Sequence, residues 1–292
     1  MRRISFIVPQ EYGGAMVKSF LRNGHGVSAG ILARAKRLPG GILVNGEESY
    51  VVRVLCAGDI VSFPAEEKPS AALPVPLPLD TVYEDEDFLV VEKPPAMPMY
   101  PTPGHDADSL MNAAAWYFRN KGETPVFYPL YRLDRDTTGL VLLGKNAYAA
   151  SAASGTVQKE YEAFCRGIIR GKGKEEGPIG ILPGHKVQRC VCPQGEPAVT
   201  YWEALESGNG LSLLRFSLET GRTHQIRVHM AHRGNPLEGD DFYGGSLEYI
   251  RRQALHASRL VFYHPIKERR MEFLSPLPPD MKRVHRILKG SK

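Results

Sequence analysis

Residues 131–143 have the sequence YRLDRDTTGLVLL. The apolar half of this stretch predicts a buried strand over 139–143, because a short unbroken apolar run is typical of a strand covered on both faces. The polar half places two acids and two arginines in the loop directly before that strand. This loop is explained equally well as a solvated turn and as the holder of a carboxylate that a neighbouring guanidinium keeps ionised.

Segments on both sides of this stretch predict a sheet with some helices. A hairpin with an acidic turn is expected over 81–91, and further strands over 159–165, 200–205 and 211–218. Helices are expected over 110–121, 147–157 and 223–233, the last with Thr223 as its N-cap and a strand as the competing assignment. Little regular structure is expected in 166–197. Strands outnumber helices without regular alternation, so the predicted fold class is α+β with a mixed, largely antiparallel sheet.

Five prolines between Pro64 and Leu79 mark the clearest boundary in the chain. Proline at this density excludes helix and central strand and favours an extended, semi-rigid spacer. We therefore predict three parts: a small α+β module over 1–64, a linker over 65–79 and a larger domain over 80–292.

The first 64 residues predict a basic pair of helices followed by a small β unit. Helices are expected over 17–21 and 29–37, a hairpin with arms 42–44 and 51–54 around the turn at Asn45-Gly46, and a strand over 57–63. This segment contains eight Lys and Arg but only four Asp and Glu, so it carries most of the chain's excess of positive charge. Arg34, Lys36 and Arg37 either form an ordinary solvated face or present cations to a phosphate backbone.

Composition sets wider limits on the class of protein. The chain has 292 residues, 42% hydrophobic and 24% charged, which excludes a disordered or fibrous protein. No apolar run reaches the length of a membrane span, and the run Ile4–Val8 is too short for a secretory leader, so a cytoplasmic location is expected. The four cysteines are too scattered for a disulfide scaffold, and Cys190 and Cys192 have no second pair to complete a metal site. The net charge of +5 suits a nucleic-acid partner.

Residues 220–234, TGRTHQIRVHMAHRG, form a second polar concentration. Its histidines His224, His229 and His232 lack a recognised metal-ligand spacing, so a basic helix beside a nucleic acid is favoured over a metal site. Lys159 and Tyr161 open a predicted strand, where a tyrosine is more often part of the core than a platform for a ligand.

In this order along the chain, these segments resemble the large-subunit (Rlu-type) ribosomal RNA pseudouridine synthases. The resemblance runs from about residue 82 to 265. It is carried by YEDEDFLVVEKPPA at 83–96, YRLDRDTTGL at 131–140, Lys159 with Tyr161, PIG at 178–180, TGRTHQIRVH at 220–229, and Leu255-His256-Ala257 with the later Leu260, Phe262, His264 and Pro265. In the first segment, Val44-Asn45-Gly46 and Gly58-Asp59-Ile60-Val61 resemble the alpha-L RNA-binding module. Tyr131 stands where the family usually has His, Thr138 where it has Ser, and Ile181 where it commonly has Arg.

The resemblance implies an isomerase that turns uridine in RNA into pseudouridine after base flipping, without cofactor or metal. It implies that Asp134 is the catalytic acid, that Arg227 pairs with it, and that Tyr161 holds the detached uracil. Arg132 would fill the space that the flipped base leaves, and Ile226, Val228 and Leu255 would exclude water. The expected site residues are Asp134, Arg227 and Tyr161 for catalysis; Arg132, Lys159, Arg222, His224, Gln225 and Ile226 for substrate; and Arg34, Lys36 and Arg37 for RNA. Asp136 and Arg135 are expected to hold the loop.

The favoured substrate is large-subunit ribosomal RNA, bound by a monomer. Transfer RNA is the alternative substrate, a catalytically silent RNA-binding clamp is the alternative from another class, and an Asp-dependent glycosidase is a third interpretation. The action of Asp134 at C1′, at C6 or on the 2′ proton stays open.

Overall fold

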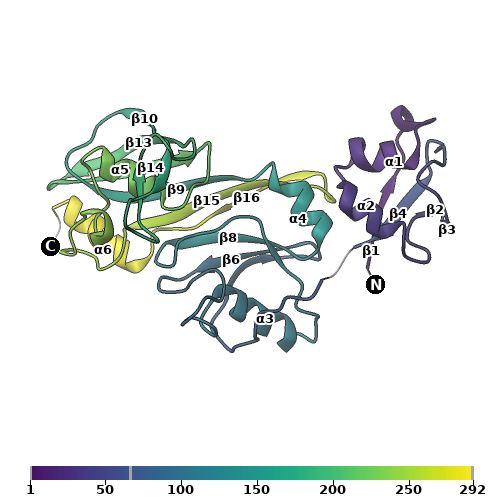
Figure 1. Cartoon of the computed structure of the whole chain (residues 1–292), viewed down its shortest axis with the longest axis horizontal. Coiled ribbons are helices and arrows are strands. Elements are labelled where there is room, and N and C mark those ends of the chain that lie inside the picture. The colour runs from purple at the N-terminus through teal and green to yellow at the C-terminus, as the bar shows by residue number, and fades with distance from the viewer. Residues whose placement is uncertain (1, 66–67, 291–292) are drawn as a thin grey trace.

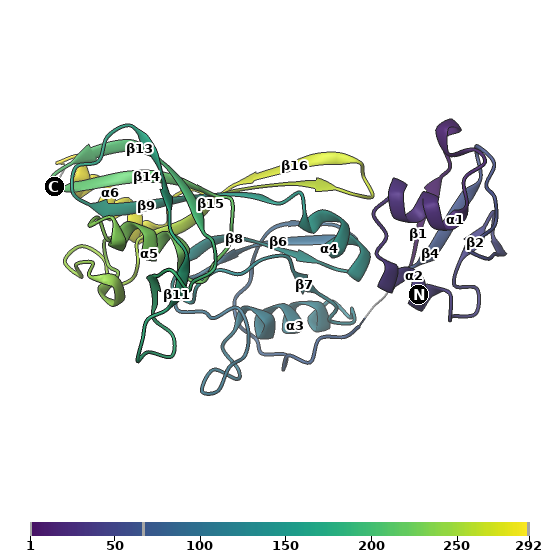
Figure 2. The same ribbon diagram turned by 45° about the horizontal axis from the view of Figure 1, so that its top comes forward.

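The computed structural model describes residues 2–65 and 68–290 and contains a long twisted sheet with helices on both faces (Figures 1 and 2). Across this sheet the strands are β10 (Lys172–Glu176), β13 (Val199–Gly208), β14 (Leu211–Leu218), β9 (Gln158–Arg166), β15 (Leu255–His264), β8 (Thr138–Gly144), β6 (Phe88–Lys93) and β5 (Asp80–Glu84). In addition, β16 (Arg269–Leu274) pairs with β15, and β7 (Tyr128–Pro129) pairs with β8. In the part of the chain that the structure describes, β15 and β8 are the only parallel neighbours in this sheet. The predicted α+β class with a mixed, largely antiparallel sheet is confirmed.

Two helices cover each face of the sheet. The core on one face includes residues of α3 (Leu110–Asn120) and α5 (Gln225–His232). On the other face, α4 (Ala147–Ser154) and α6 (Pro279–Leu288) contribute to two further cores. Successive residues of a strand point to opposite faces, so Leu89 packs in the α3 core and Phe88 in the α4 core. This explains the unbroken apolar runs of β6 and β8.

Gly139 brings β8 and β15 together just behind the polar loop 131–137. Its φ is +113°, and a Cβ atom at this position would lie 2.3 Å from the carbonyl oxygen of Ala257. The parallel pairing of Gly139 with Ala257 therefore requires glycine. This close approach joins the loop that carries Asp134 to the segment around residue 255.

The N-terminal residues form a separate four-stranded sheet in the order β1-β4-β2-β3. Its strands are β1 (Arg3–Ile7), β4 (Ile60–Pro64), β2 (Leu43–Val44) and β3 (Glu47–Glu48). Beside it lie α1 (Val17–Ser19), a π-helical turn over Phe20–Gly24, and α2 (Ala29–Ala35). The two helices were predicted, but β1 was not, since its run of apolar residues is short.

The predicted hairpin arm over 51–54 is wrong. Asn45 and Gly46 both have positive φ, 54° and 86°, as in a type I′ turn, so the chain returns at once and Val44 pairs with Glu47. Residues 51–54 instead run along the start of α1, where the Lys18 amide donates to the Val51 carbonyl.

Two other predictions are also corrected. The segment 166–197 contains three strands, β10, β11 (Ile179–Ile181) and β12 (Arg189–Val191). The residues of β10 are mostly charged, and β11 and β12 are only three residues long each, so none of the three shows an apolar pattern typical of a strand. Helix α5 has His224 as its N-cap instead of Thr223, because His224 adopts φ 59° and ψ 20° and makes the left-handed turn into the helix.

The proline-rich segment packs against the large domain instead of standing free of it. Glu66 and Glu67 of the predicted linker lie outside the described residues. Ala72, Leu77 and Leu79 pack against the core beneath α3, and the Val75 amide donates to the Asn112 carbonyl. The three domain boundaries stay a prediction. Among the described residues, no helix is long and apolar enough to cross a membrane.

Tyr148 on α4 connects the N-terminal sheet to the large domain. Its buried ring lies 5.9 Å from the Phe6 ring and 5.5 Å from the Phe63 ring, centroid to centroid. Its hydroxyl donates to the His25 carbonyl at 2.8 Å. Arg2 adds an ion pair with Asp87 at 2.7 Å.

We expect Tyr148→Ala to lower the free energy of unfolding by about 3 kcal/mol or more, because it empties an aromatic site. Tyr148→Phe should cost about 1 kcal/mol, because it removes only the hydrogen bond. Urea unfolding of the whole chain measures both. Equal effects of the two variants would contradict the packing role.

Candidate active site

The predicted catalytic and substrate-binding residues converge on one cavity of about 1000 Å³. It lies between the loop 131–137, the start of β9, the N-terminal end of α5 and the hairpin of β11 and β12. Its walls include all the predicted catalytic and substrate-binding residues: Asp134, Arg227, Tyr161, Arg132, Lys159, Arg222, His224, Gln225 and Ile226. The folded chain thus brings together residues up to 95 positions apart, from Arg132 to Arg227.

Two buried cations fix the loop that carries Asp134. Lys93 Nζ donates to the Arg135 carbonyl at 2.7 Å, and also to the Pro94 and Met97 carbonyls at 2.8 and 2.9 Å. Arg252 Nη1 donates to the Asp136 carbonyl at 3.0 Å. Burial lowers the pKa of Lys93 to about 7, while its three carbonyl acceptors match the three N–H groups of the protonated form.

The Asp136 side chain accepts a hydrogen bond from the Ala96 amide at 3.1 Å. This contact joins the loop to the turn after β6. The position agrees with the expectation that Asp136 holds the loop.

Arg227 lies between two carboxylates. Its Nη1 is 3.1 Å from Asp134 Oδ2, while its Nε and Nη2 donate to Asp240 at 2.7 and 2.8 Å. The Asp240 side chain is 1% exposed and that of Asp134 is 25% exposed. Although burial disfavours the charge, hydrogen bonds from Arg227 to Asp240 and the charges of Asp240 and Asp134 raise the pKa of Arg227. Asp240 therefore anchors the guanidinium, and Asp134 remains the carboxylate that faces the cavity.

His224 lies beside this pair. Its Nε2 is 4.0 Å from Asp134 Oδ2, and its Nδ1 is 2.8 Å from the Tyr243 hydroxyl. Burial lowers the pKa of His224, and the Arg227 charge acts in the same direction against the Asp134 carboxylate. The Tyr243 oxygen already accepts the Arg189 amide, so its own hydrogen is available to His224 Nδ1. This arrangement favours a neutral ring whose Nε2–H faces Asp134.

Tyr161 and Lys159 both reach the cavity from β9. Tyr161 is buried, and its burial together with the charge of Asp134 raises its pKa, so the phenol stays protonated. Lys159 Nζ lies 4.3 Å from the centre of the Tyr131 ring, and its burial lowers its pKa to about 8. Tyr131 donates its hydroxyl to the Leu140 carbonyl at 2.9 Å. The tyrosine that replaces the family's histidine thus supplies an aromatic face for the Lys159 ammonium.

Two predicted substrate-binding residues use their polar groups within the protein. The Gln225 amide bonds to Thr220, to the Arg222 amide and to the Val199 and Thr200 oxygens. Arg222 pairs with Glu196 and donates to the Pro197 carbonyl. Both line the cavity, and their contacts hold the turn before α5 against β13.

Of the residues predicted to form an apolar wall, Ile226 and Leu255 line the cavity, whereas Val228 does not. Val228 lies two positions after Ile226 on the helix, so it faces another side and packs with Ile179 and Ala198.

The predicted RNA-binding residues Arg34, Lys36 and Arg37 are not part of the cavity. All three are exposed, at the end of α2 and directly after it.

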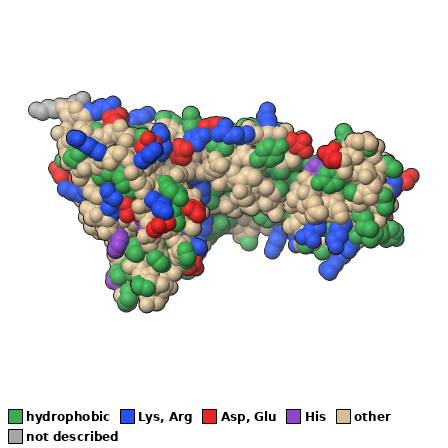
Figure 3. Space-filling model, turned by 90° about the horizontal axis from the view of Figure 1, so that it is seen from above, with side chains coloured by type: hydrophobic (Ala, Val, Ile, Leu, Met, Phe, Trp, Pro, Cys, Tyr) green, Lys and Arg blue, Asp and Glu red, His purple; other side chains and the backbone are tan. Residues whose placement is uncertain are grey.

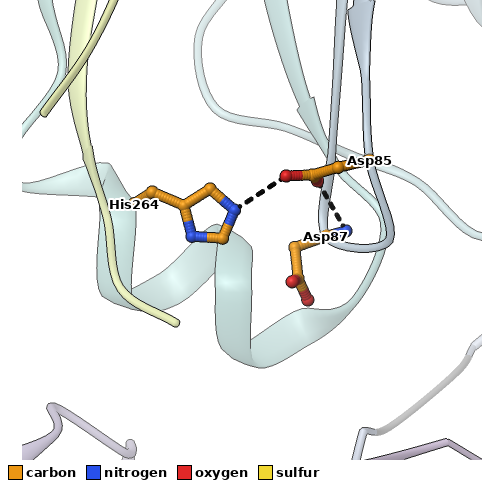
Figure 4. Close-up of side chains that lie close together, drawn as sticks. All are labelled: Asp85, Asp87 and His264. Atoms are coloured by element: carbon orange, nitrogen blue, oxygen red, sulfur yellow. Dashed lines mark hydrogen bonds and ion pairs between the residues drawn. The ribbon is translucent and has the colours of Figure 1, made fainter. Parts of the chain in front are cut away.

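A separate group of one histidine and two aspartates, Asp85, Asp87 and His264, could in principle hold a metal ion. His264 Nε2 lies 3.0 Å from Asp85 Oδ2, and the Asp87 amide donates to Asp85 Oδ1 (Figure 4). Lys267 Nζ is 2.6 Å from Asp85, and Arg2 Nη1 is 2.7 Å from Asp87. Although burial opposes ionisation, the hydrogen bonds from His264 and Lys267 hold the pKa of Asp85 well below its usual range. The protein's own cations thus neutralise these carboxylates, so the group acts as a structural junction.

Several residues of the site were missed by the sequence analysis: Lys93 as a loop anchor, Arg189, Asp240, Tyr243 and Arg252. The sequence does contain an indication for Lys93, because a lysine at the end of an apolar strand must find partners for a buried charge. The others lie in segments whose folding over the cavity no local pattern indicates.

Comparison with known proteins agrees with this geometry. A family model described as RNA pseudouridylate synthase matches residues 87–232. An uncharacterized RNA pseudouridine synthase, YjbO, of Bacillus subtilis (strain 168) is 39% identical over 267 residues, which is 89% of this chain and 94% of the relative. The ribosomal large subunit pseudouridine synthase D of Escherichia coli (strain K12) is 37% identical over 271 residues, which is 85% of this chain and 83% of the relative.

A solved structure shares the fold. The human RNA pseudouridylate synthase domain containing 1 protein superposes with a TM-score of 0.56 at 25% identity, over 77% of this chain and 98% of that protein.

Proposed function

Because the chain belongs to the RNA pseudouridine synthase family, we propose that it modifies large-subunit ribosomal RNA with Asp134 as the catalytic carboxylate. The chain is an isomerase: in the target uridine the N1–C1′ bond breaks, the uracil turns, and C5 joins C1′, while the proton leaves C5 and N1 takes up a proton. The observation that carries the assignment of Asp134 is its contact with Arg227, 3.1 Å long, in the wall of the cavity.

Asp134 acts on the nucleotide through the carboxylate oxygen that Arg227 does not occupy. Among the described residues, nothing donates a hydrogen bond to Asp134 Oδ1. Arg227 is itself fixed by Asp240, so the carboxylate is oriented before the substrate binds, and no reorganisation is needed during the reaction. His224 is neutral and faces Asp134, so it does not replace Arg227 as the ion-pair partner of this carboxylate.

Tyr161 holds the uracil after the glycosidic bond has broken. Stacking of a base on an aromatic ring contributes about 1–3 kcal/mol and tolerates rotation of the base in its plane. Ile226 and Leu255 line the same cavity and keep water from C1′, where it would convert isomerisation into hydrolysis.

Two cations complete the substrate site. Lys159 has no carboxylate partner among the described residues, so its ammonium is available to an oxygen of the nucleotide. Arg132 is exposed at the cavity, 5.9 Å from the centre of the Tyr100 ring, where it can fill the space that the flipped base leaves in the RNA.

The ribosomal target rests on the name of the Escherichia coli relative and on the basic N-terminal module. We propose that residues 1–64 form an alpha-L-like module that binds RNA through Arg34, Lys36 and Arg37. Lys and Arg side chains gather along one side of this lobe in Figure 3. Cations on an exposed face add affinity by releasing counterions from the phosphate backbone.

Asp134→Asn should lower the rate of tritium release from RNA labelled at uracil C5 by a factor on the order of 10⁴ or more, because the reaction loses its carboxylate. Affinity for RNA should change little. Asp241→Asn, an exposed aspartate near the same site, is the matched control and should keep full activity. Release that survives Asp134→Asn would contradict the assignment.

Replacing Arg34, Lys36 and Arg37 together by Gln should weaken binding to a large-subunit ribosomal RNA fragment at least about 10-fold at moderate salt. The matched control replaces Lys282, Arg283 and Arg286, which are exposed on α6, and should bind normally. Wild-type enzyme should prefer this fragment to transfer RNA in competition. Equal losses in both triple variants would contradict the module's role, and a preference for transfer RNA would contradict the ribosomal target.

A further inference from the structure

Arg189, the first residue of β12, faces the active-site cavity. Ile179 pairs with Val191 across the β11–β12 hairpin, and both pack with Val228 of α5. Side chains two positions apart on a strand share a face, so Arg189 lies on the same side of the hairpin as these residues, toward α5. Arg189 lines the cavity together with Asp134.

Hydrogen bonds connect the backbone of Arg189 to Tyr243 and His224, which lie beside Asp134 and Arg227. Its amide donates to the Tyr243 hydroxyl at 3.0 Å, and that hydroxyl also bonds to His224 Nδ1 at 2.8 Å. The Tyr243 ring centre lies 5.0 Å from the Arg227 guanidinium carbon. The position of Arg189 is therefore fixed relative to Asp134 and Arg227.

The side chain of Arg189, in contrast, has no hydrogen-bond or ion-pair partner among the described residues. Its Nε is buried without a hydrogen bond, and no carboxylate in the described part of the chain pairs with its guanidinium. Leaving such a donor unsatisfied is costly, and native proteins rarely do so without a functional reason. Arg222 and Arg227, on the same cavity, are already paired with carboxylates. Arg189 is thus a cation on a fixed stretch of backbone, without an anionic partner in the described part of the chain.

We infer that Arg189 binds a phosphate of the RNA backbone beside the extruded uridine. This inference rests on the proposed function of the cavity. A flipped nucleotide enters with a phosphate on each side, and a guanidinium fork matches phosphate oxygens in geometry and charge.

The residue opposite Arg189 supports this assignment. The family resemblance leads one to expect an arginine after Pro178-Ile179-Gly180, but this chain has Ile181 there. Ile181 pairs directly with Arg189 across the hairpin and is 51% exposed. Directly paired residues share a face of the hairpin, so this chain carries on β12 the cation that is missing from β11. An arginine at either position should therefore serve the same phosphate.

The test compares four variants of the full chain with wild type: Arg189→Ala, Arg189→Lys, the double variant Ile181→Arg/Arg189→Ala, and Arg170→Ala. Arg170 is exposed and does not line the cavity, so it is the matched control. Binding to large-subunit ribosomal RNA is measured over a range of salt concentrations, and tritium release from the same RNA labelled at uracil C5 gives kcat and KM. Thermal unfolding checks that each variant is folded.

Arg189→Ala should raise Kd and KM about 10-fold and reduce the slope of log affinity against log salt by about 1, with kcat nearly unchanged. Arg189→Lys and the double variant should restore the slope, and Arg170→Ala should leave every value unchanged. An Arg189→Ala enzyme that binds more weakly with an unchanged salt slope would show a structural role and overturn the inference, as would unchanged binding. Wild-type enzyme that releases no tritium would overturn the proposed function instead.

Discussion

The geometry of the site depends on one buried arginine that is shared by two carboxylates. Asp240 binds two nitrogens of Arg227 and is almost completely buried, while Asp134 binds one and stays partly accessible. A buried guanidinium that loses such a partner leaves an uncompensated charge, which costs several kcal/mol. The pair Arg227–Asp240 is therefore a fixed support, and Asp134 is the group whose position it determines. A carboxylate oriented in this way needs no further ordering when RNA binds.

Contacts elsewhere in the large domain fix the position of Asp134, the other partner in the contact with Arg227. Asp134 lies in a loop whose carbonyl groups are bound by Lys93 and Arg252, two charges that would otherwise be expensive to bury. The loop leads into β8, in which Gly139 lies so close to β15 that only glycine fits. Two segments that are 118 positions apart in the sequence thus meet beside the cavity.

Local sequence patterns predicted the parts of this structure that depend on local physics. The apolar run after Gly139 became a central strand, and Asn45-Gly46 made the tight turn that was expected of it. The polar edge strand β10 was missed because apolar periodicity is weak at a sheet edge. Arg227 was assigned to Asp134 only through the family resemblance, since 93 positions separate them. Asp240 and Arg189 were not found, because their roles arise from tertiary contacts that no spacing encodes.

The most direct test of the central claim is a double-mutant cycle between Asp240 and Arg227, read as kcat for tritium release. If Asp240 acts through Arg227, Asp240→Asn and Arg227→Met should each lower kcat on the order of 100-fold, and the double variant should be no slower than the worse single variant. Losses that multiply in the double variant would mean that the two residues act independently, and would contradict the account.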